Sequence, residues 1–450
     1  MTTPGITVSE HQIDEDRWRV LSTRASWAVV LVGCAASVLL TRSWLSGRVT
    51  VDLEVYRAAG SAFVHGRDIY LVHPPGWPLV FTYPPLSALL AIPLAVIPNV
   101  DAQLAMALIS VLAILSVSLI ATRSAAPTWP RSSRLRLALA VCAAAPLLEP
   151  VRETMKLGQV DLALMSLVML DLCGSRETRL RGVLVGLATA IKLTPGVFIL
   201  YLLASRRSRE ALMAGATFAA STGMAFLIAP SASTRYWTRL VFSDRRVGNA
   251  DVVRDQSLRG AIVRLGGSTA SGHLIWLVAA GLTLTWGLVV AVRWRKRGDE
   301  LFSLGLVALT GLLISPISWD HHWVWALPLA VALWRRWATL GGTGRLLTAG
   351  AWTATFSLAA LWWSRDYHLV GLHGVLADSY VLLGLLVILM AWAESAPGLG
   401  PAAMTGRVST TRSRITPKSA EHHVGRVLNK LGVRSRAEAA AIAAVSVRDS

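Results

Sequence analysis

Two carboxylates, Asp52 and Glu54, lie two positions apart shortly after the first long apolar run of the chain. Paired carboxylates suit a general base with a helper residue, or half of a cation site, because they accept protons and bind hard cations. The alternative is that both residues only mark the point where the chain leaves a membrane. The loop that follows is dense in prolines and aromatic residues, among them Tyr83 in the segment FTYPP. We interpret it as an ordered loop that shapes a groove.

Lys192 lies near the middle of the apolar run 182–204. A lysine at the centre of a membrane helix costs about 2.5–3.5 kcal/mol on insertion scales, so it usually faces a cavity or a partner. Snorkelling of the side chain to the interface is the alternative. We favour a buried cation for an anionic ligand, with a phosphate as the candidate. The turn 150–159 adds Arg152 and Lys156, which interrupt the positive-inside pattern and hint at function.

Two polar segments complete the set of candidates. The segment RDQSLRG contains Gln256 and Arg259, and a solvated loop is an equal alternative for it. The segment SPISWDHHWVW contains His321 and His322 between tryptophans. Adjacent residues of a helix point about 100° apart, so paired histidines have poor spacing for a metal. We predict a phosphate- or sugar-binding histidine and no metal, with tryptophans as sugar platforms or interfacial anchors.

The composition restricts the elements that can position these residues. Of the 450 residues, 54% are apolar and only 16% are charged, whereas soluble domains carry about 25% charged residues. A soluble globular protein and a disordered chain are both excluded. We predict an all-α, polytopic integral membrane protein with about twelve transmembrane helices, because apolar runs approaching about 20 residues recur along the chain. The clearest are 27–46, 103–122, 135–149, 160–173, 182–204, 211–229, 273–293, 302–318, 323–335, 344–363 and 376–394.

Charge predicts the orientation in the plasma membrane. The net charge is +18, and five short basic stretches carry part of it: 131–136, 176–181, 206–209, 293–297 and 335–336. The positive-inside rule places them in the cytoplasm, so nucleic acid is not the expected partner. This orientation requires the run 85–97 to be a short interfacial or re-entrant helix, and 182–204 to be two half-helices broken at 192–195. The active site then lies on the extracytoplasmic face.

Six motifs between about residues 50 and 325 together carry a family resemblance: DLEVY, FTYPP, GQVDLALM, AIKLTP, DQSLRG and SPISWDHHWVW. In this order they resemble the polyprenol-phosphate-mannose-dependent α-1,2-mannosyltransferases, which have the GT-C membrane fold. The resemblance implies a polyprenyl-phosphate-mannose donor and a glycolipid acceptor of the phosphatidylinositol mannoside or lipomannan type, with membrane lipids around both. It implies no cofactor and no nucleotide, in keeping with the lack of a Gly-rich phosphate loop.

The resemblance also assigns roles to residues at matching positions. Asp52 matches the aspartate of the family's first loop, which is the expected catalytic base. The other matches concern substrate binding and are Lys192, Gln256, Arg259, His321 and His322. Asp161, Asp255 and Asp320 depart from the family, whose members usually have Asn, Asn, and Ser or Thr at these positions. Glu54 is not a fixed choice either, so the added negative charge leaves the exact acceptor open.

The family reaction inverts the anomeric configuration, because the donor's mannose is β-linked and the product is α-linked. One base then suffices, and Asp52 would take the proton from an acceptor hydroxyl as it attacks the anomeric carbon. The leaving lipid phosphate gains negative charge, which preorganised cations stabilise in a low-dielectric site. The candidates for this role are Lys192, Arg152, Arg259 and one of His321 or His322.

The composition changes near residue 396 and predicts the outer parts of the chain. We predict a cytoplasmic N-terminal segment (1–25), a GT-C catalytic domain (26–395), a linker (396–414) and a cytoplasmic helical tail (415–450). The tail resembles the second half of a LuxR-type helix-turn-helix, without its first two helices. A recognition helix needs its partner helix, so we do not expect DNA binding, and the basic residues suit anionic lipid headgroups.

Three alternatives remain open at the level of sequence. A GT-C enzyme could transfer another polyprenyl-phosphate sugar, such as an arabinofuranosyl unit. A transporter or flippase with a buried lysine would predict internal repeats of broken helices, which the sequence does not show. It would also leave Asp52 without a role. A membrane-tethered transcription regulator depends on the truncated tail alone.

Overall fold

The computed structural model describes residues 50–174, 179–243, 246–267, 270–363 and 372–395. The apolar run 27–46, the linker and the tail lie outside these ranges, so what we expect of them stays a prediction. Within the described ranges the chain is helical and forms no β-strand, apart from one isolated antiparallel bridge between Asp255 and Trp319. The predicted all-α class is confirmed for this part of the chain.

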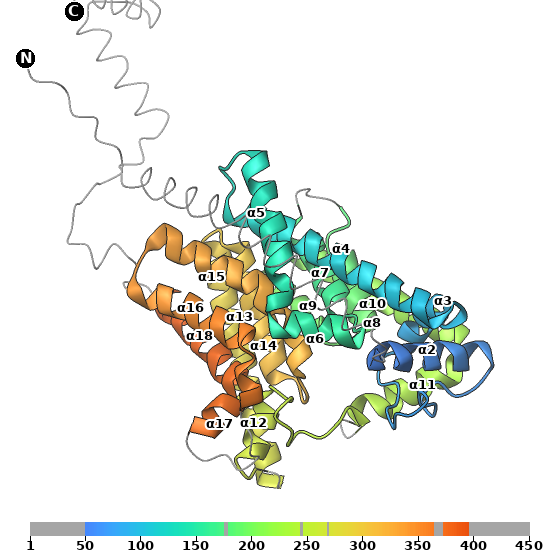
Figure 1. The fold of residues 1–450 in the computed structure, drawn as a ribbon. Coiled ribbons are helices and arrows are strands. Elements are labelled where there is room, and N and C mark those ends of the chain that lie inside the picture. Colours follow the sequence, from blue (N-terminus) through green and yellow to red (C-terminus); the bar gives the residue numbers. More distant parts are fainter. Residues whose placement is uncertain (1–49, 175–178, 244–245, 268–269, 364–371, 396–450) are drawn as a thin grey trace, which may run out of the picture. The chain divides into compact units, whose positions relative to one another are not determined.

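The helices differ widely in length, and Figure 1 shows their arrangement. In chain order they are α2 (Val51–Val64), α3 (Pro85–Val96), α4 (Asn99–Ala125), α5 (Arg131–Ala144), η1 (Ala145–Leu147), α6 (Glu149–Leu157), α7 (Asp161–Cys173), α8 (Val183–Ile191), α9 (Gly196–Ala204), α10 (Ser208–Ile228), α11 (Pro230–Thr238), η2 (Leu240–Phe242), α12 (Leu258–Arg264), α13 (Ala270–Lys296), α14 (Glu300–Ile314), η4 (Asp320–Trp325), α15 (Ala326–Leu340), α16 (Thr343–Ser357), η5 (Ala360–Trp363), α17 (Leu372–Ala377) and α18 (Ser379–Ser395). Helices α3, α6 and α11 have proline in their first turn, where its fixed φ suits the helix and its missing N–H costs nothing.

Three of the described helices, α4, α10 and α13, are long and apolar enough to cross a membrane. Their apolar surface is largely turned outward, since only 22% of the most apolar stretch of α10 and of α13 is buried, and 39% of that of α4. The shorter helices α3, α14 and α18 are also apolar. An apolar surface of this kind requires lipid, so the protein is a helical membrane protein. The described helices do not reach the predicted number of about twelve spans.

The largest hydrophobic core fills the space between α4, α7, α9, α14, α15, α16 and α18. Its centre holds fully buried aromatic side chains, among them Trp323, Trp352, Phe356 and Tyr380. Packing rather than hydrophobic exclusion holds helices together in lipid, because lipid tails are as apolar as the side chains. Helices α13 and α14 therefore approach closely at Gly287, where a Cβ would lie 2.0 Å from the Thr310 hydroxyl oxygen.

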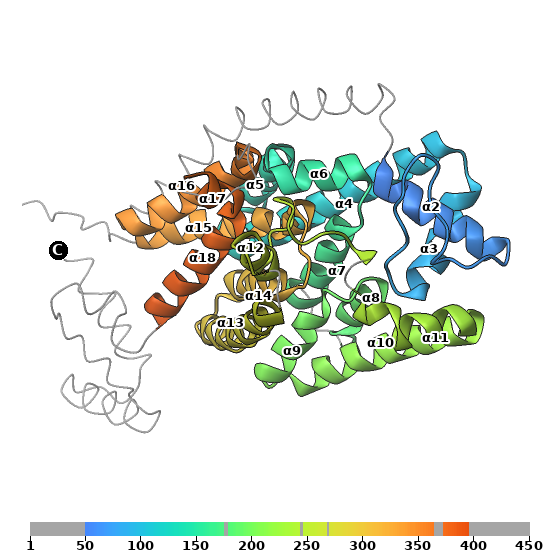
Figure 2. The ribbon, with the colours of Figure 1, turned by 90° about the horizontal axis from the view of Figure 1, so that it is seen from below.

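A second, smaller core packs α2 against α3, α11 and the start of α4. Helices α2, α3 and α11 lie together in both views (Figures 1 and 2). Leu53, Tyr56 and Phe81 are buried in this core. It therefore anchors the first turn of α2, which carries Asp52.

The apolar run 182–204 folds as two helices, α8 and α9, separated by residues 192–195. Lys192 caps α8 in an extended conformation (φ −146°, ψ 132°), and Pro195 precedes α9. The predicted break is confirmed. The run 85–97 also forms a short helix, α3, which contains Pro93. The side of the membrane on which these helices lie stays a prediction.

Candidate active site

Helix α6 ends at Gly158, which has the left-handed conformation (φ 69°, ψ 36°) typical of glycine at a helix C-terminus. A Cβ at this position would lie 2.8 Å from the Cβ of Leu53 and 3.4 Å from the Cβ of Thr50. The end of α6 can therefore lie directly against the start of α2. This contact brings Gln159 next to Asp52, and Nε2 of Gln159 donates to Oδ2 of Asp52 over 3.1 Å.

The amide of Gln159 is held in one orientation by three neighbours. Its Oε1 accepts from the backbone N–H of Val160 over 2.9 Å and from the hydroxyl of Tyr56. The Tyr83 hydroxyl lies 3.1 Å from Oε1 and 3.0 Å from Nε2. Because a backbone N–H can only donate, Oε1 must face Val160 and Nε2 must face the carboxylate of Asp52.

Asp52 lies in the first turn of α2, where the helix dipole favours a carboxylate. Burial raises the pKa of Asp52, while the charges of His321 and Lys192 act in the opposite direction. The carboxylate of Asp161 adds to the rise. A carboxylate with a raised pKa is a stronger base, so Asp52 is suited to take a proton from a hydroxyl.

Lys192 is buried in the break between α8 and α9. Its Nζ lies 2.7 Å from Oδ1 of Asp161, at the start of α7, and 3.1 Å from Nε2 of His322. The same Nζ lies over the ring of Tyr83, 5.4 Å from the centroid. The predicted buried cation is therefore present. Its acidic partner, Asp161, has no role in the prediction from sequence.

The 3₁₀ helix η4 brings both histidines to this place. The rings of His321 and His322 meet edge to face, with centroids 4.7 Å apart. In the described part of the chain, Nε2 of His321 and Nδ1 of His322 are buried without a hydrogen-bond partner. An unpaired buried polar atom costs free energy, so these nitrogens mark a place that a polar ligand can fill. We call Asp52, Asp161, Lys192, His321 and His322 the Lys192 cluster.

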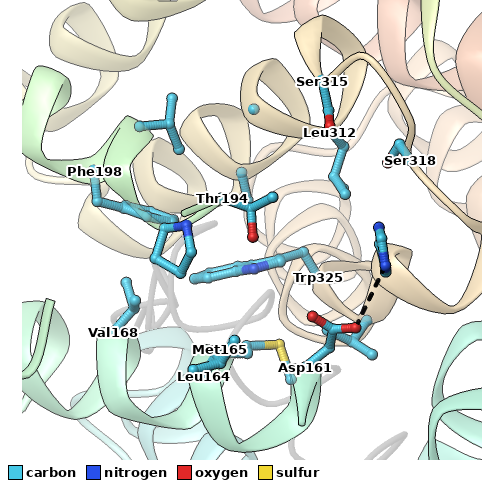
Figure 3. Close-up of a pocket in the computed structure, with 16 residues that line it drawn as sticks. Asp161, Leu164, Met165, Val168, Thr194, Phe198, Leu312, Ser315, Ser318 and Trp325 are labelled. Atoms are coloured by element: carbon cyan, nitrogen blue, oxygen red, sulfur yellow. Dashed lines mark ion pairs between the residues drawn. The ribbon is translucent and has the colours of Figure 1, made fainter. Parts of the chain in front are cut away.

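A pocket opens beside the Lys192 cluster, with Asp161 and His322 in its lining. Figure 3 shows Asp161 and Ser318 on one side of it and Val168 and Phe198 on the other. Its polar end therefore lies at the cluster, and its lining away from the cluster is mostly apolar. The apolar residues that line it are Leu164, Met165, Val168, Val197, Phe198, Leu312, Val324 and Trp325. Such a pocket fits a ligand with a charged group on a hydrocarbon chain.

Three residues of the cluster have the atoms to hold a metal ion. Ligand atoms of Asp161, His321 and His322 all lie within 4.8 Å of one another. The ammonium of Lys192, however, already pairs with Asp161 and lies 3.1 Å from Nε2 of His322. A divalent cation here would be repelled by this buried charge at close range. The arrangement therefore fits an anion better than a metal ion.

The segment around Arg254 is hydrogen-bonded to the segment that carries the two histidines. The backbone N–H of Asp320 donates to the carbonyl of Arg254 over 2.8 Å, and that of Gln256 to the carbonyl of Ser318 over 2.7 Å. Oδ1 of Asp255 accepts from the backbone N–H of Ser318 over 2.8 Å. Two motifs that are distant in sequence therefore form one unit, in which the first holds the backbone of the second.

Gln256, a predicted substrate-binding residue, makes its hydrogen bonds to the backbone. Its Nε2 donates to the carbonyls of Val253 and Ala377, and its Oε1 accepts from the N–H of Tyr380 over 3.1 Å. It is fully buried. The structure thus shows Gln256 joining this segment to α17 and α18, and a part in substrate binding stays a prediction.

Three more predicted residues, Glu54, Arg152 and Arg259, make contacts outside the Lys192 cluster. Asn99 donates to the carboxylate of Glu54 and ties α2 to α4. The guanidinium of Arg152 lies 3.4 Å from each of two carbonyls of η1. That of Arg259 lies 5.7 Å from the centroid of the Trp276 ring. Their predicted part in substrate binding stays a prediction, whereas Tyr83 lies within the site.

Comparison with known proteins identifies the family to which the chain belongs. The pattern of glycosyltransferase family 87 matches residues 81–316, just over half of the chain. The chain belongs to glycosyltransferase family 87. Together with its lipid-facing helices, this makes the protein a membrane glycosyltransferase.

The family 87 chain has curated relatives that match over most of their length. A relative from Mycobacterium tuberculosis is 35% identical over 430 residues, which are 88% of this chain and 96% of the relative. One from Mycolicibacterium smegmatis is 37% identical over 74% of this chain and 82% of the relative. Both are named polyprenol-phosphate-mannose-dependent α-(1-2)-phosphatidylinositol mannoside mannosyltransferase. A second M. smegmatis relative is 34% identical over 72% of this chain and 82% of the relative. It is named polyprenol-phosphate-mannose-dependent α-(1-2)-phosphatidylinositol pentamannoside mannosyltransferase.

No solved structure matches the chain. No role is predicted from the sequence for three residues of this family 87 glycosyltransferase: Gln159, Tyr56 and Asp161. Gln159 follows a glycine that ends a helix, and a polar residue at such a turn beside an apolar run is the signal that could have found it. Asp161 opens α7 and could have been recognised as the partner that a buried lysine requires.

Proposed function

We propose that this protein transfers mannose from polyprenyl-phosphate-mannose to a hydroxyl of a phosphatidylinositol mannoside or lipomannan-type glycolipid, forming an α-1,2 linkage with inversion. The names of the relatives support the donor and the class of acceptor. The observation that carries the proposal is that the carboxylate of Asp52, held by Gln159, interacts electrostatically with the buried ammonium of Lys192, whose partners Asp161 and His322 line an apolar pocket.

Asp52 acts as the general base in this proposal. Gln159 holds one carboxylate oxygen, and burial makes the group more basic than an exposed aspartate. The acceptor hydroxyl loses its proton to Asp52 as its oxygen bonds to the anomeric carbon of mannose. The bond between that carbon and the phosphate oxygen breaks on the opposite face, and the electron pair leaves with the phosphate.

The leaving phosphate is stabilised by the other members of the Lys192 cluster. Lys192 supplies a fixed positive charge, and the unpartnered nitrogens of His321 and His322 supply hydrogen bonds. Such preorganised groups contribute most in a buried site, because they need no reorganisation when charge develops. The prenyl chain lies in the apolar part of the pocket, with Met165, Val168 and Phe198 along it.

The overall architecture belongs to the same proposal. The chain has a cytoplasmic N-terminal segment (1–25), a GT-C catalytic domain (26–395), a linker (396–414) and a cytoplasmic helical tail (415–450). The catalytic domain has about twelve spans in the plasma membrane, enough for the apolar runs of the sequence. Its active site faces the extracytoplasmic side. Labelling of a cysteine at Ser205 from outside intact cells would contradict this orientation.

The test is a membrane assay with labelled polyprenyl-phosphate-mannose and candidate glycolipids. The wild type is expected to transfer mannose, and Asp52→Asn to lose transfer while it still binds the donor. The matched control is Asp68→Asn, which makes the same chemical change at a surface pair with Arg235 and should keep activity. Normal turnover by the Asp52 variant would contradict the assignment of the base. Transfer only from a polyprenyl-phosphate arabinofuranose would contradict the donor.

A further inference from the structure

Asp320 opens η4 directly before the paired histidines and is fully buried. Its Oδ1 lies 3.3 Å from Nδ1 of His321 and accepts the backbone N–H of the same residue over 2.9 Å. One carboxylate oxygen thus contacts both the ring and the backbone of His321. A carboxylate accepts hydrogen bonds only, so Nδ1 must carry the proton that faces it.

Arg254 keeps this carboxylate in place. Its Nε lies 3.1 and 3.2 Å from the two oxygens of Asp320, and Nη2 lies 3.0 Å from Oδ1. The guanidinium also lies over the ring of Trp362, 5.4 Å from the centroid. Burial alone would raise the pKa of Asp320, but the hydrogen bond of His321 and the charge of Arg254 hold it well below its usual range.

Glu149, on α6, is the second carboxyl group near Asp320. Burial and the charge of Asp320 raise the pKa of Glu149 to about 8. Its two oxygens lie 3.0 Å from the indole nitrogen of Trp362 and 2.9 Å from the hydroxyl of Tyr380. The raised pKa favours the protonated form of Glu149 near neutral pH, so Asp320 carries most of the negative charge that faces His321 from this side.

On its other side His321 lies next to Asp161 and His322. A hydroxyl of α6, that of Thr154, donates to the backbone carbonyl of His321 over 2.7 Å and fixes the turn. Nε2 of His321 is buried and has no hydrogen-bond partner among the described residues. A ring nitrogen of His321 lies within 4.8 Å of a carboxylate oxygen of Asp161, the partner of Lys192, and the charge of His321 also acts on Asp52. The free nitrogen is thus available to the reacting groups.

We propose that Asp320, held by Arg254, is a positioning residue that fixes the orientation of the positively charged His321 ring, so that its Nε2–H faces the reacting sugar phosphate. This inference rests on the proposed function. It assigns to Asp320 a role that acts only through the histidine. Loss of Asp320 should therefore slow the transfer step more than it weakens donor binding.

The test is a double-mutant cycle in the full-length protein, with Asp320→Asn, His321→Gln and the double variant. Asp320→Asn is expected to lower kcat about 10- to 100-fold, typical of a residue that orients a reacting side chain, with little change in donor KM. The double variant should be no slower than His321→Gln, because Asp320 has nothing left to orient. Additive losses, or wild-type kcat in Asp320→Asn, would overturn the proposal.

Asp378→Asn is the matched control for effects on folding. Asp378 pairs with the buried Arg264, whose Nε lies 3.0 Å from Oδ1 of Asp378. Like Asp320→Asn, this variant therefore removes the charge of a carboxylate that faces an arginine. It should lower the thermal stability without changing kcat, and its effect should add to that of His321→Gln. A wild-type protein that does not use polyprenyl-phosphate-mannose would contradict the proposed function instead. Active wild type with an additive cycle would contradict only the role of Asp320.

Discussion

Two of the groups of buried or half-buried charges in the described part of the chain are built from different residues. The Lys192 cluster combines lysine and histidine with two aspartates. A second group, which we call the arginine cluster, joins α14, α15, α16 and α18 and consists of Asp299, Arg335, Arg336, Arg345 and Glu394. Both groups place charged side chains between apolar helices. The differences between the groups therefore indicate which charges stabilise the fold and which could take part in a reaction.

In the arginine cluster every carboxylate oxygen has a partner. Oδ2 of Asp299 pairs with Arg335 and Arg336, and its Oδ1 accepts the backbone N–H of Phe302 over 3.2 Å. The two oxygens of Glu394 pair with Arg336 and Arg345. Guanidinium groups stay charged and bind carboxylates in a fixed fork. This arrangement stabilises the packing of four helices.

Among the residues that the structure describes, the Lys192 cluster instead leaves carboxylate and imidazole atoms without hydrogen-bond partners, whereas the atoms of the arginine cluster that lack one are the guanidinium nitrogens Nε of Arg335 and of Arg345. Within the described residues, Oδ2 of Asp161, Nε2 of His321 and Nδ1 of His322 are buried and make no hydrogen bond. All of its residue types can change protonation state, unlike arginine. Unpaired buried atoms lower stability. A bound ligand can supply the missing partners, so the comparison supports the proposal that the chemistry occurs at the Lys192 cluster.

The largest expected effect comes from removing the charge at the centre of the cluster. Lys192→Met should lower kcat/KM about 10²- to 10³-fold, because a preorganised group that stabilises developing charge contributes about this much. It should also destabilise the fold by about 3–5 kcal/mol, since Asp161 is left buried without its partner. Mannosyl transfer and thermal unfolding in detergent measure the two effects.

The double variant Lys192→Met with Asp161→Asn separates these effects. The removal of both charges should restore most of the thermal stability and none of the activity. Recovery of activity in the double variant would show that Lys192 serves only to compensate Asp161. The site would then resemble the arginine cluster, and the comparison would fail.

Much of the helical architecture follows from the sequence. The apolar runs predict most of the described helices, and the break at Lys192 follows from a charge and a proline within one run. Helix length is harder to predict, because a turn as short as residues 192–195 divides one apolar run into two helices. The count of about twelve spans therefore depends on how each run is divided, and only three described helices are long enough by themselves.

The site was predicted in part. Asp52, Lys192, Tyr83 and the two histidines stand out because their residue types are unusual beside apolar runs. For Gln159 the sequence offers only a polar residue at a turn, whereas its contact with Asp52 comes from the packing of α6 against α2 at Gly158. Contacts between segments distant in sequence arise from packing, which a single sequence does not reveal. The same holds for the contact of Arg254 with Asp320.

A smaller effect is expected when the general base loses its hydrogen bond. Gln159→Leu removes the donor to Asp52, which favours the protonated acid and raises the already raised pKa of Asp52 further. Activity requires the carboxylate, so the acid limb of the kcat/KM profile should move to higher pH. The expected displacement is about one pH unit, because a hydrogen bond to a charged group contributes about 1.5 kcal/mol or more. Gln159→Glu would add a negative charge and is not a suitable control. Asp68→Asn should leave the pH of the acid limb unchanged.

The smallest effect on activity is expected in the arginine cluster. Asp299 caps α14 through Oδ1, and Asn caps a helix as well as Asp does, so Asp299→Asn removes the charge and keeps the cap. Arg335 and Arg336 then lose their shared counter-charge, and the thermal unfolding temperature should fall. Turnover per folded molecule should stay within about twofold of wild type, because substitutions far apart without shared partners act independently. A loss of turnover as large as that of Lys192→Met would mean that the two charged groups are coupled, and that unpaired atoms alone do not distinguish the active site.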